Sequence, residues 1–161
     1  MSQASPRDRR RSKTDSPQKI VRRFCVDVLQ TIEQRNILRG GETAVLAVSG
    51  GADSLSLLEA MVRLRDSLRV TLHVAHCDRG IRPSSPDDAD FVQARAAEHG
   101  LGFHLGHADP KPPKGRSLEE HLRDQRGAFL IGIANEVGAA RILTGHTLDD
   151  QAETVLMNLL T

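Results

Sequence analysis

A glycine-rich segment, SGGADS at residues 49–54, has the clearest potential for chemistry in this sequence. It follows a continuous apolar run at residues 43–48 and precedes a pattern typical of a helix. Glycines allow a tight turn, so that successive amide N–H groups and the helix N-terminus point at one place, which suits an anion such as phosphate. Because such turns are common without any ligand, geometry alone leaves a phosphate site and a plain turn open.

The same segment differs from two other well-known loops. A Walker A loop places a lysine after its glycines, but the lysines of this chain are at positions 13, 19, 111 and 114. A G-x-S-x-G nucleophile elbow is excluded because position 47 is alanine. Ordinary transfer of a γ-phosphoryl group is therefore disfavoured.

A second group of reactive residue types lies near the end of the chain, in HTLDDQAET at residues 146–154. On a helix, the adjacent Asp149 and Asp150 point about 100° apart, whereas Asp150 and Glu153 share a face. Together with His146, these acids could bind a metal ion, orient an amine or act as a base. Acids at a helix start also stabilise the helix through its dipole, and this second interpretation stays open.

Two arginines on a long expected helix, Arg123 and Arg126, are three residues apart and face the same way, as phosphate-binding side chains should. Arg123 could equally pair with Glu119 or its neighbour on a solvated surface. Arg82 is a better ligand candidate because it follows the second expected strand, and Asp78 could orient Arg82 or contact substrate.

The expected elements explain how these segments meet. Strands are expected at residues 43–48, 70–75, 102–105 and 141–145, and helices at residues 19–36, 55–64, 86–99, 117–137 and 148–160. Strands that alternate with helices predict the α/β class, with an open parallel sheet and helices on both faces. Ligands bind such sheets beyond the carboxyl ends of the strands, where the segments described above should converge.

Length and composition predict one domain with a charged tail. The chain has 161 residues, of which 39% are hydrophobic, close to an ordinary globular domain. We interpret residues 1–18 as a disordered basic tail and residues 19–161 as a single domain. Because the chain ends within an apolar helical pattern, we expect the domain to be incomplete at its C-terminal end.

Several classes of protein are disfavoured. Charges interrupt every apolar run before the roughly 18 residues that a membrane span needs, so we expect no membrane association. Cys25 and Cys77 form no C-x-x-C pair, which argues against a disulfide framework or a zinc site and favours the cytoplasm. We expect none of four histidines near the strands to bind metal: His73, His76, His104 and His107.

The segment SGGADS after an apolar strand resembles the pyrophosphate loop of the ATP-pyrophosphatase (PP-loop) superfamily. The resemblance implies a Rossmann-like nucleotide-binding fold that cleaves ATP between its α and β phosphates. It also implies that pyrophosphate is held by five residues: Ser49, Gly50, Gly51, Asp53 and Ser54. Asp53 could bind Mg²⁺ or simply cap the helix.

Three further segments resemble the tRNA(Ile)-lysidine synthetase family: DRGIRP at 78–83, LEEHLRDQRGAFL at 118–130 and GHTLDDQAET at 145–154. The resemblance implies substrate contacts from Asp78, Arg82, Arg123 and Arg126. It implies catalytic roles for Asp53, His146, Asp149, Asp150 and Glu153, with Mg²⁺ on Asp53 and Asp150. Two positions depart from the family pattern, since Arg79 replaces a histidine and Gly127 a tyrosine.

The implied reaction ligates L-lysine to C2 of the wobble cytidine of tRNA(Ile), through an adenylated base, with release of AMP and pyrophosphate. ATP and Mg²⁺ would be the cofactors and tRNA and L-lysine the partners, and a homodimer could cover an open sheet edge. Two alternatives stay open: another PP-loop adenylating enzyme, such as a tRNA thiolase or an amide-forming synthetase, and a non-catalytic nucleotide-binding fragment. Thiolation is disfavoured because Cys25 and Cys77 are far apart in the sequence.

Overall fold

The computed structural model of the protein describes residues 16–81, 85–145 and 157–158. In chain order, the elements are α1 (Pro17–Gln34), β1 (Thr43–Ala47), α2 (Ala52–Leu68), β2 (Thr71–Asp78), α3 (Ser85–Glu98), β3 (Gly102–His107), α4 (Leu118–Glu136), β4 (Arg141–Thr144) and β5 (Met157–Asn158). This alternation confirms the expected α/β class with an open, mainly parallel sheet.

The strands form one sheet in the order β3-β2-β1-β4-β5. The pairs β1–β2, β2–β3 and β1–β4 are parallel, while β5 is antiparallel to β4. The chain first builds outward from β1 to β3 and then returns to the other side of β1 with β4. The strand order therefore reverses between β1 and β4, which is where such sheets bind ligands.

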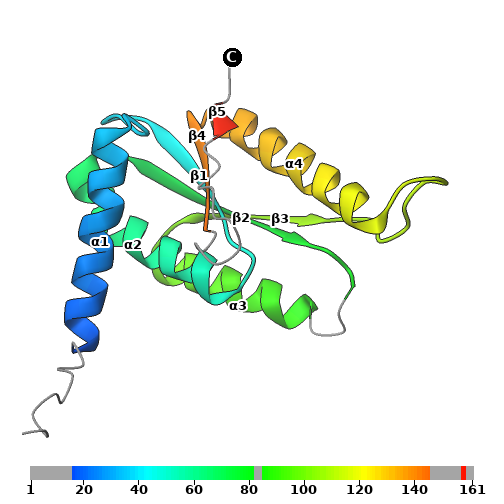
Figure 1. The fold of residues 1–161 in the computed structure, drawn as a ribbon, viewed down its shortest axis with the longest axis horizontal. Coiled ribbons are helices and arrows are strands. Elements are labelled where there is room, and N and C mark those ends of the chain that lie inside the picture. Colours follow the sequence, from blue (N-terminus) through cyan, green and yellow to red (C-terminus); the bar gives the residue numbers. More distant parts are fainter. Residues whose placement is uncertain (1–15, 82–84, 146–156, 159–161) are drawn as a thin grey trace, which may run out of the picture.

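Helices cover both faces of the sheet (Figure 1). On one face, side chains of β1, β2 and β4 pack with α1, α2 and α3 in the larger core cluster. On the other face, α4 packs alone on β1, β2 and β4 in a smaller cluster. Successive residues of β1 alternate between the two clusters, because neighbouring side chains of a strand point to opposite faces.

Several element boundaries differ from the sequence expectation, and three of these differences have a clear structural reason. The expected helix over 148–160 is wrong at Met157–Asn158, which pair with β4 and so satisfy backbone groups on its outer edge. Strand β2 continues to Asp78 because β3 pairs with it as far as His107. Helix α1 begins at Pro17, inside the expected tail, since proline is well suited to the first helical turn.

Candidate functional site

The loop between β1 and α2 is braced from inside by one serine. The Ser54 side chain is only 3% exposed, and its hydroxyl accepts a hydrogen bond from the Ser49 amide at 3.1 Å and donates to the Gly51 carbonyl at 3.0 Å. Ser49 itself is exposed, with its hydroxyl 3.1 Å from that of Ser54. The loop is therefore held closed by Ser54, while Ser49 faces the solvent.

The Gly51 amide donates to the Ser49 hydroxyl at 3.4 Å, and the next three amides of α2, those of residues 52–54, have no hydrogen-bond acceptor within the described residues. Gly50 has a φ of +90°, a conformation that side chains rarely adopt. Gly51 is the N-cap and supplies no side chain to the first turn. The first amides of a helix have no carbonyl partner within it and carry the positive end of its dipole. This arrangement suits an anion, in particular a phosphate.

Asp53 lies in the first turn of α2 and is exposed. It does not cap the helix, because the N-cap position belongs to Gly51. Its carboxylate makes no hydrogen bond or ion pair with any other residue of the described part of the chain. An exposed carboxylate beside a phosphate site fits a hard cation such as Mg²⁺, which prefers oxygen ligands.

A buried histidine, His76, fixes the start of the loop, a role that the sequence pattern does not predict. His76 is 4% exposed, and its Nδ1 lies 2.7 Å from the Val48 carbonyl, to which it donates. The Val48 amide donates in turn to the Ala75 carbonyl at 3.0 Å. Two hydrogen bonds, one to the carbonyl and one from the amide of Val48, therefore hold the backbone just before Ser49 on β2. The available signal was one of two histidines, His73 and His76, within a largely apolar strand.

The end of β4 packs directly on the start of α2. A Cβ atom added to Gly145 would lie 2.7 Å from the carbonyl oxygen of Asp53 and 2.9 Å from the Cα of Ser54. Both atoms belong to the backbone, so only glycine fits here without a shift. The ends of β1 and β4 thus meet at the first turn of α2, which is the point where the strand order reverses.

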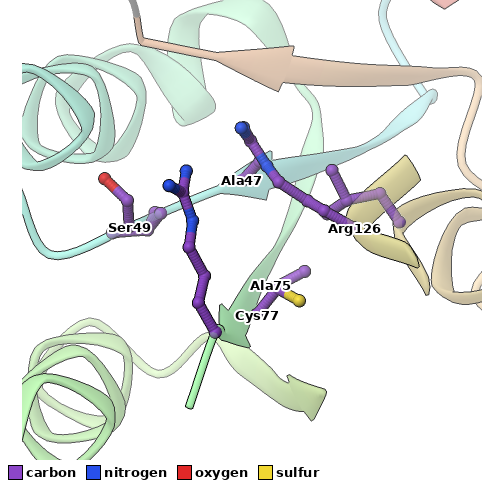
Figure 2. Close-up of a pocket in the computed structure, with 8 residues that line it drawn as sticks. Ala47, Ser49, Ala75, Cys77 and Arg126 are labelled. Atoms are coloured by element: carbon purple, nitrogen blue, oxygen red, sulfur yellow. The ribbon is translucent and has the colours of Figure 1, made fainter. Parts of the chain in front are cut away.

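A small pocket adjoins this loop on the face covered by α4 (Figure 2). Its apolar floor and polar rim are formed by Ala47, Val48, Ser49, Ala75, Cys77, Arg79, Arg126 and Leu130. Figure 2 shows Arg126 extending from α4 toward the end of β1. Burial, and then repulsion from Arg79, lower the pKa of Arg126. Burial raises the pKa of the Cys77 thiol, although both arginines act in the opposite direction.

The comparison with known protein families agrees with this geometry. The profile of a family described as a PP-loop domain matches residues 21–161, nearly the whole chain. The chain belongs to the PP-loop family. Membership of this family implies the use of ATP. The assignment of residues 49–54 to the family's pyrophosphate loop stays a prediction from the sequence.

The curated relatives of this PP-loop chain include several tRNA(Ile)-lysidine synthases. The one from Thermus thermophilus is 47% identical over 119 residues, which are 72% of this chain and 23% of the relative. The relative from Symbiobacterium thermophilum is 39% identical, over 83% of this chain and 28% of the relative. The relative from Chlorobaculum tepidum is 37% identical, over 81% of this chain and 41% of the relative. The chain therefore spans well under half the length of these relatives.

A solved structure supports the same fold. The U34-tRNA thiolase NcsA from Methanococcus maripaludis, described with its [4Fe-4S] cluster, superimposes with a TM-score of 0.71. The likeness covers 83% of this chain and 47% of that one, at 18% sequence identity. At this identity, the likeness concerns the fold and not the activity.

The structure separates the two arginines that the sequence places on one face of the PP-loop domain's long helix. Arg126 lines the pocket, whereas Arg123 is exposed and its Nη2 lies 3.3 Å from Oε1 of Glu119. The surface ion pair considered for Arg123 is thus present. Because exposed pairs contribute little, Arg123 remains available for another ligand.

Asp78, the last residue of β2, supports the turn that follows it. Its Oδ1 accepts a hydrogen bond from the Gly80 amide at 2.8 Å, and its Oδ2 lies 3.6 Å from Nδ1 of His107. Gly80 has a positive φ of 63°, which the turn requires. The structure thus gives Asp78 a local role at the strand end, and its predicted contact with substrate stays a prediction.

Five predicted site residues lie outside the described part of the PP-loop domain, and their roles stay predictions: Arg82, His146, Asp149, Asp150 and Glu153. Among the described residues, no group of three or more His, Cys, Asp or Glu side chains could hold a metal ion. In the same ranges, no helix is both long and apolar enough to cross a membrane.

Proposed function

We propose that this chain is the ATP-binding part of an enzyme that ligates L-lysine to C2 of the wobble cytidine of tRNA(Ile). The observation that carries the proposal is the braced PP-loop, with its free helix amides and the exposed Asp53 beside them. The names of the matched relatives supply the choice of tRNA and L-lysine as substrates. Cytoplasmic location and a homodimer remain predictions from the sequence.

The proposed reaction has two steps. In the first, the C2 oxygen of the cytidine attacks the α-phosphorus of ATP, and the bond between that phosphorus and the bridging oxygen breaks to release pyrophosphate. In the second, a lysine amine attacks C2, loses a proton, and displaces AMP as the C2–O bond breaks. Both leaving groups carry phosphate charge, so donors placed at that charge stabilise the transition states.

The residues of this chain suit the first step. The amides at the start of α2, together with the exposed Ser49, would hold the β and γ phosphates as a departing pyrophosphate. The absence of a lysine after the glycines fits, because the γ-phosphoryl group itself is not transferred. Mg²⁺, held by Asp53 and, as the sequence predicts, Asp150, would neutralise part of the phosphate charge.

The second step needs residues that activate the amine. The sequence predicts that His146, Asp149, Asp150 and Glu153 supply this function. They follow Gly145, whose contact with Asp53 brings the end of β4 to the loop. This contact supports a common site for the two groups, because Gly145, which directly precedes them in sequence, lies at the start of α2.

The test is an assay of ATP products with the 161-residue chain, Mg²⁺, tRNA and L-lysine, each substrate being omitted in turn. We expect AMP and pyrophosphate, not ADP and phosphate, and dependence on both tRNA and L-lysine. Asp53→Asn should abolish AMP formation while leaving the melting temperature unchanged. Asp66→Asn, an exposed aspartate at the far end of the same helix, is the matched control and should retain full activity.

Direct measurement of ATP binding by calorimetry separates the alternatives. ATP binding without turnover under all conditions would support a nucleotide-binding fragment and contradict catalysis by this chain. AMP formation that persists in Asp53→Asn would contradict the assignment of that carboxylate. AMP formation that depends on tRNA and a sulfur donor, but not on L-lysine, would favour the thiolase alternative.

A further inference from the structure

A proline-rich loop between β3 and α4, residues 108–117, projects from the body of the molecule (Figure 1). Its sequence, ADPKPPKGRS, contains three prolines and two lysines, Lys111 and Lys114. Every residue from 109 to 117 is exposed. Because proline fixes the φ angle, the segment is stiff, and it presents both lysines to the solvent.

Both ends of this loop are fixed to α4. At the start, the Asp109 amide donates to Oε1 of Gln125 at 2.9 Å, and Nε2 of Gln125 donates to the Asp109 carbonyl at 3.0 Å. At the end, the Arg116 amide donates to the Pro113 carbonyl at 3.1 Å, and the Arg116 side chain pairs with Asp124. A loop that is already ordered loses little conformational entropy when a partner binds.

The charge of the loop is positive. It carries three basic residues and one acidic residue, Asp109. The Asp109 carboxylate accepts a hydrogen bond from the Lys111 amide at 3.0 Å, so it is engaged by the loop's own backbone. On the neighbouring helix, Glu119 pairs with Arg123 across one turn. The outer part of the loop therefore attracts an anionic partner.

The loop lies at the same edge of the sheet as the glycine segment at residues 49–54. Strands β1, β2 and β3 are parallel neighbours, so the segments that follow them leave the sheet at one edge. Two strand spacings separate β1 from β3, which is roughly 10 Å. Between them, the turn after β2 contacts the loop, since a Cβ atom added to Gly80 would lie 3.8 Å from Cδ of Pro110. The loop thus borders the edge at which the proposed reaction takes place.

The chemistry of the two lysines favours one class of anion. A lysine ammonium is a compact point charge without the planar fork of arginine, so it contacts phosphates without requiring one geometry. In nucleic-acid complexes, contacts of this kind fix the position of the backbone and do not read the bases. A polynucleotide that delivers one nucleotide to residues 49–54 extends well beyond 10 Å, and its phosphodiesters can reach the loop.

We propose that residues 108–117 form an RNA-binding surface, in which Lys111 and Lys114 contact backbone phosphodiesters beside the nucleotide that is modified. The choice of tRNA as the RNA rests on the proposed function. The loop contributes affinity and orientation, and the identity of the modified base is read elsewhere.

The first experiment is a lysine footprint, for which this chain is well suited because its four lysines are at positions 13, 19, 111 and 114. The chain is acetylated with an N-hydroxysuccinimide ester, with and without an unmodified tRNA transcript, and mass spectrometry reads each lysine separately. We expect the RNA to protect Lys111 and Lys114 at low salt and not at high salt. RNA contacts made by the basic N-terminal residues do not affect this result, because they fall on other lysines.

The second experiment measures the affinity for the same transcript as a function of salt. The double variant Lys111→Gln/Lys114→Gln should reduce the slope of log K against log salt by about 2 and raise Kd about tenfold at about 0.1 M salt. Lys111→Arg/Lys114→Arg should keep the parent slope. Arg35→Gln/Arg63→Gln is the matched control, since it removes two exposed positive charges at the ends of α1 and α2, and it should also keep the parent slope.

The outcomes distinguish this proposal from the proposed function. Protection of both lysines, with weaker binding in the glutamine variant only, supports the RNA surface even if the chain never forms AMP. Equal slopes in the glutamine variant and the arginine control overturn the proposal, and so does a chain that binds no RNA. A partner of another class, such as an acidic protein, would leave the lysines unprotected by RNA. AMP formation that depends on Asp53 but not on the loop lysines would contradict the RNA surface alone.

Discussion

The contact between β4 and α2 leads to a prediction for Gly145→Ala. The added methyl group would lie 2.7 Å from the carbonyl oxygen of Asp53 and 3.0 Å from its carbonyl carbon. These backbone atoms cannot rotate away as the end of a long side chain can, so the end of β4 or the first turn of α2 must move by several tenths of an ångström. Overpacking of this kind costs about 1–3 kcal/mol. For a chain of this size, the melting temperature should fall by roughly 2–12 °C.

The same shift should weaken nucleotide binding, because the displaced turn carries the amides proposed to hold the phosphates. Circular dichroism would measure the melting temperature, and calorimetry would measure ATP affinity. Gly132→Ala is the matched control, since it makes the same chemical change on α4 where an added Cβ meets nothing within 4 Å. Alanine is favoured over glycine in a helix by about 1 kcal/mol, so the control should be as stable as the parent or more stable.

Equal melting temperatures and ATP affinities in the two alanine variants would refute the reasoning. The end of β4 would then not press on the first turn of α2, and Gly145 would lie farther from Asp53 than the structure places it. A loss of stability in Gly145→Ala with unchanged ATP affinity would refute only the predicted effect on nucleotide binding. The amides at the start of α2 would then not be the phosphate ligands.

Two further predictions concern stability. Ser54→Ala should lower the free energy of unfolding by about 1–3 kcal/mol, because it removes two part-buried hydrogen bonds, one from the Ser49 amide and one to the Gly51 carbonyl. Ser56→Ala, on the exposed side of α2, should cost less, and equal losses would contradict the bracing role. Burial alone would raise the pKa of Glu59, but hydrogen bonds from His99 and an arginine of α3 outweigh it and lower that pKa below 4.5. This carboxylate therefore stabilises the fold above pH 4.5 and less as the pH falls through its lowered pKa. Glu59→Gln should melt below the parent at pH 7, and the difference should shrink as the pH falls through the lowered pKa of Glu59, whereas a constant difference would contradict the ion pair.

The architecture could be predicted because its signals are local. Each core strand is a short apolar run, and each helix has apolar residues at steps of three and four, so the α/β alternation is visible along the chain. The glycine segment between β1 and α2 stands out for the same reason. Strand β2 was predicted too short because its last three residues, His76, Cys77 and Asp78, are polar or small. Pairing with β3, and not hydrophobicity, makes them a strand.

The contacts that complete the site could not be predicted in this way, because they join residues far apart in sequence. The bond from His76 to the Val48 carbonyl spans 28 residues, and Gly145 meets Asp53 only after the strand order has reversed. Period-two alternation indicates which face of a strand a residue occupies, but not which neighbouring loop it meets. Such contacts depend on the topology of the sheet, and the sequence pattern alone leaves that topology open.

The partial burial of Arg126 follows from the helical periodicity of α4. The buried residues of α4 are Leu122, Leu130 and Ala134, and Arg126 lies on the same stripe, four residues after the first and four before the second. Residues four apart share a helix face, so this stripe turns Arg126 toward the sheet. Arg123 lies off the stripe and accordingly faces solvent. A charged residue within an otherwise apolar stripe is costly to bury without a partner, so such a position is a signal of a candidate site that the sequence pattern offers.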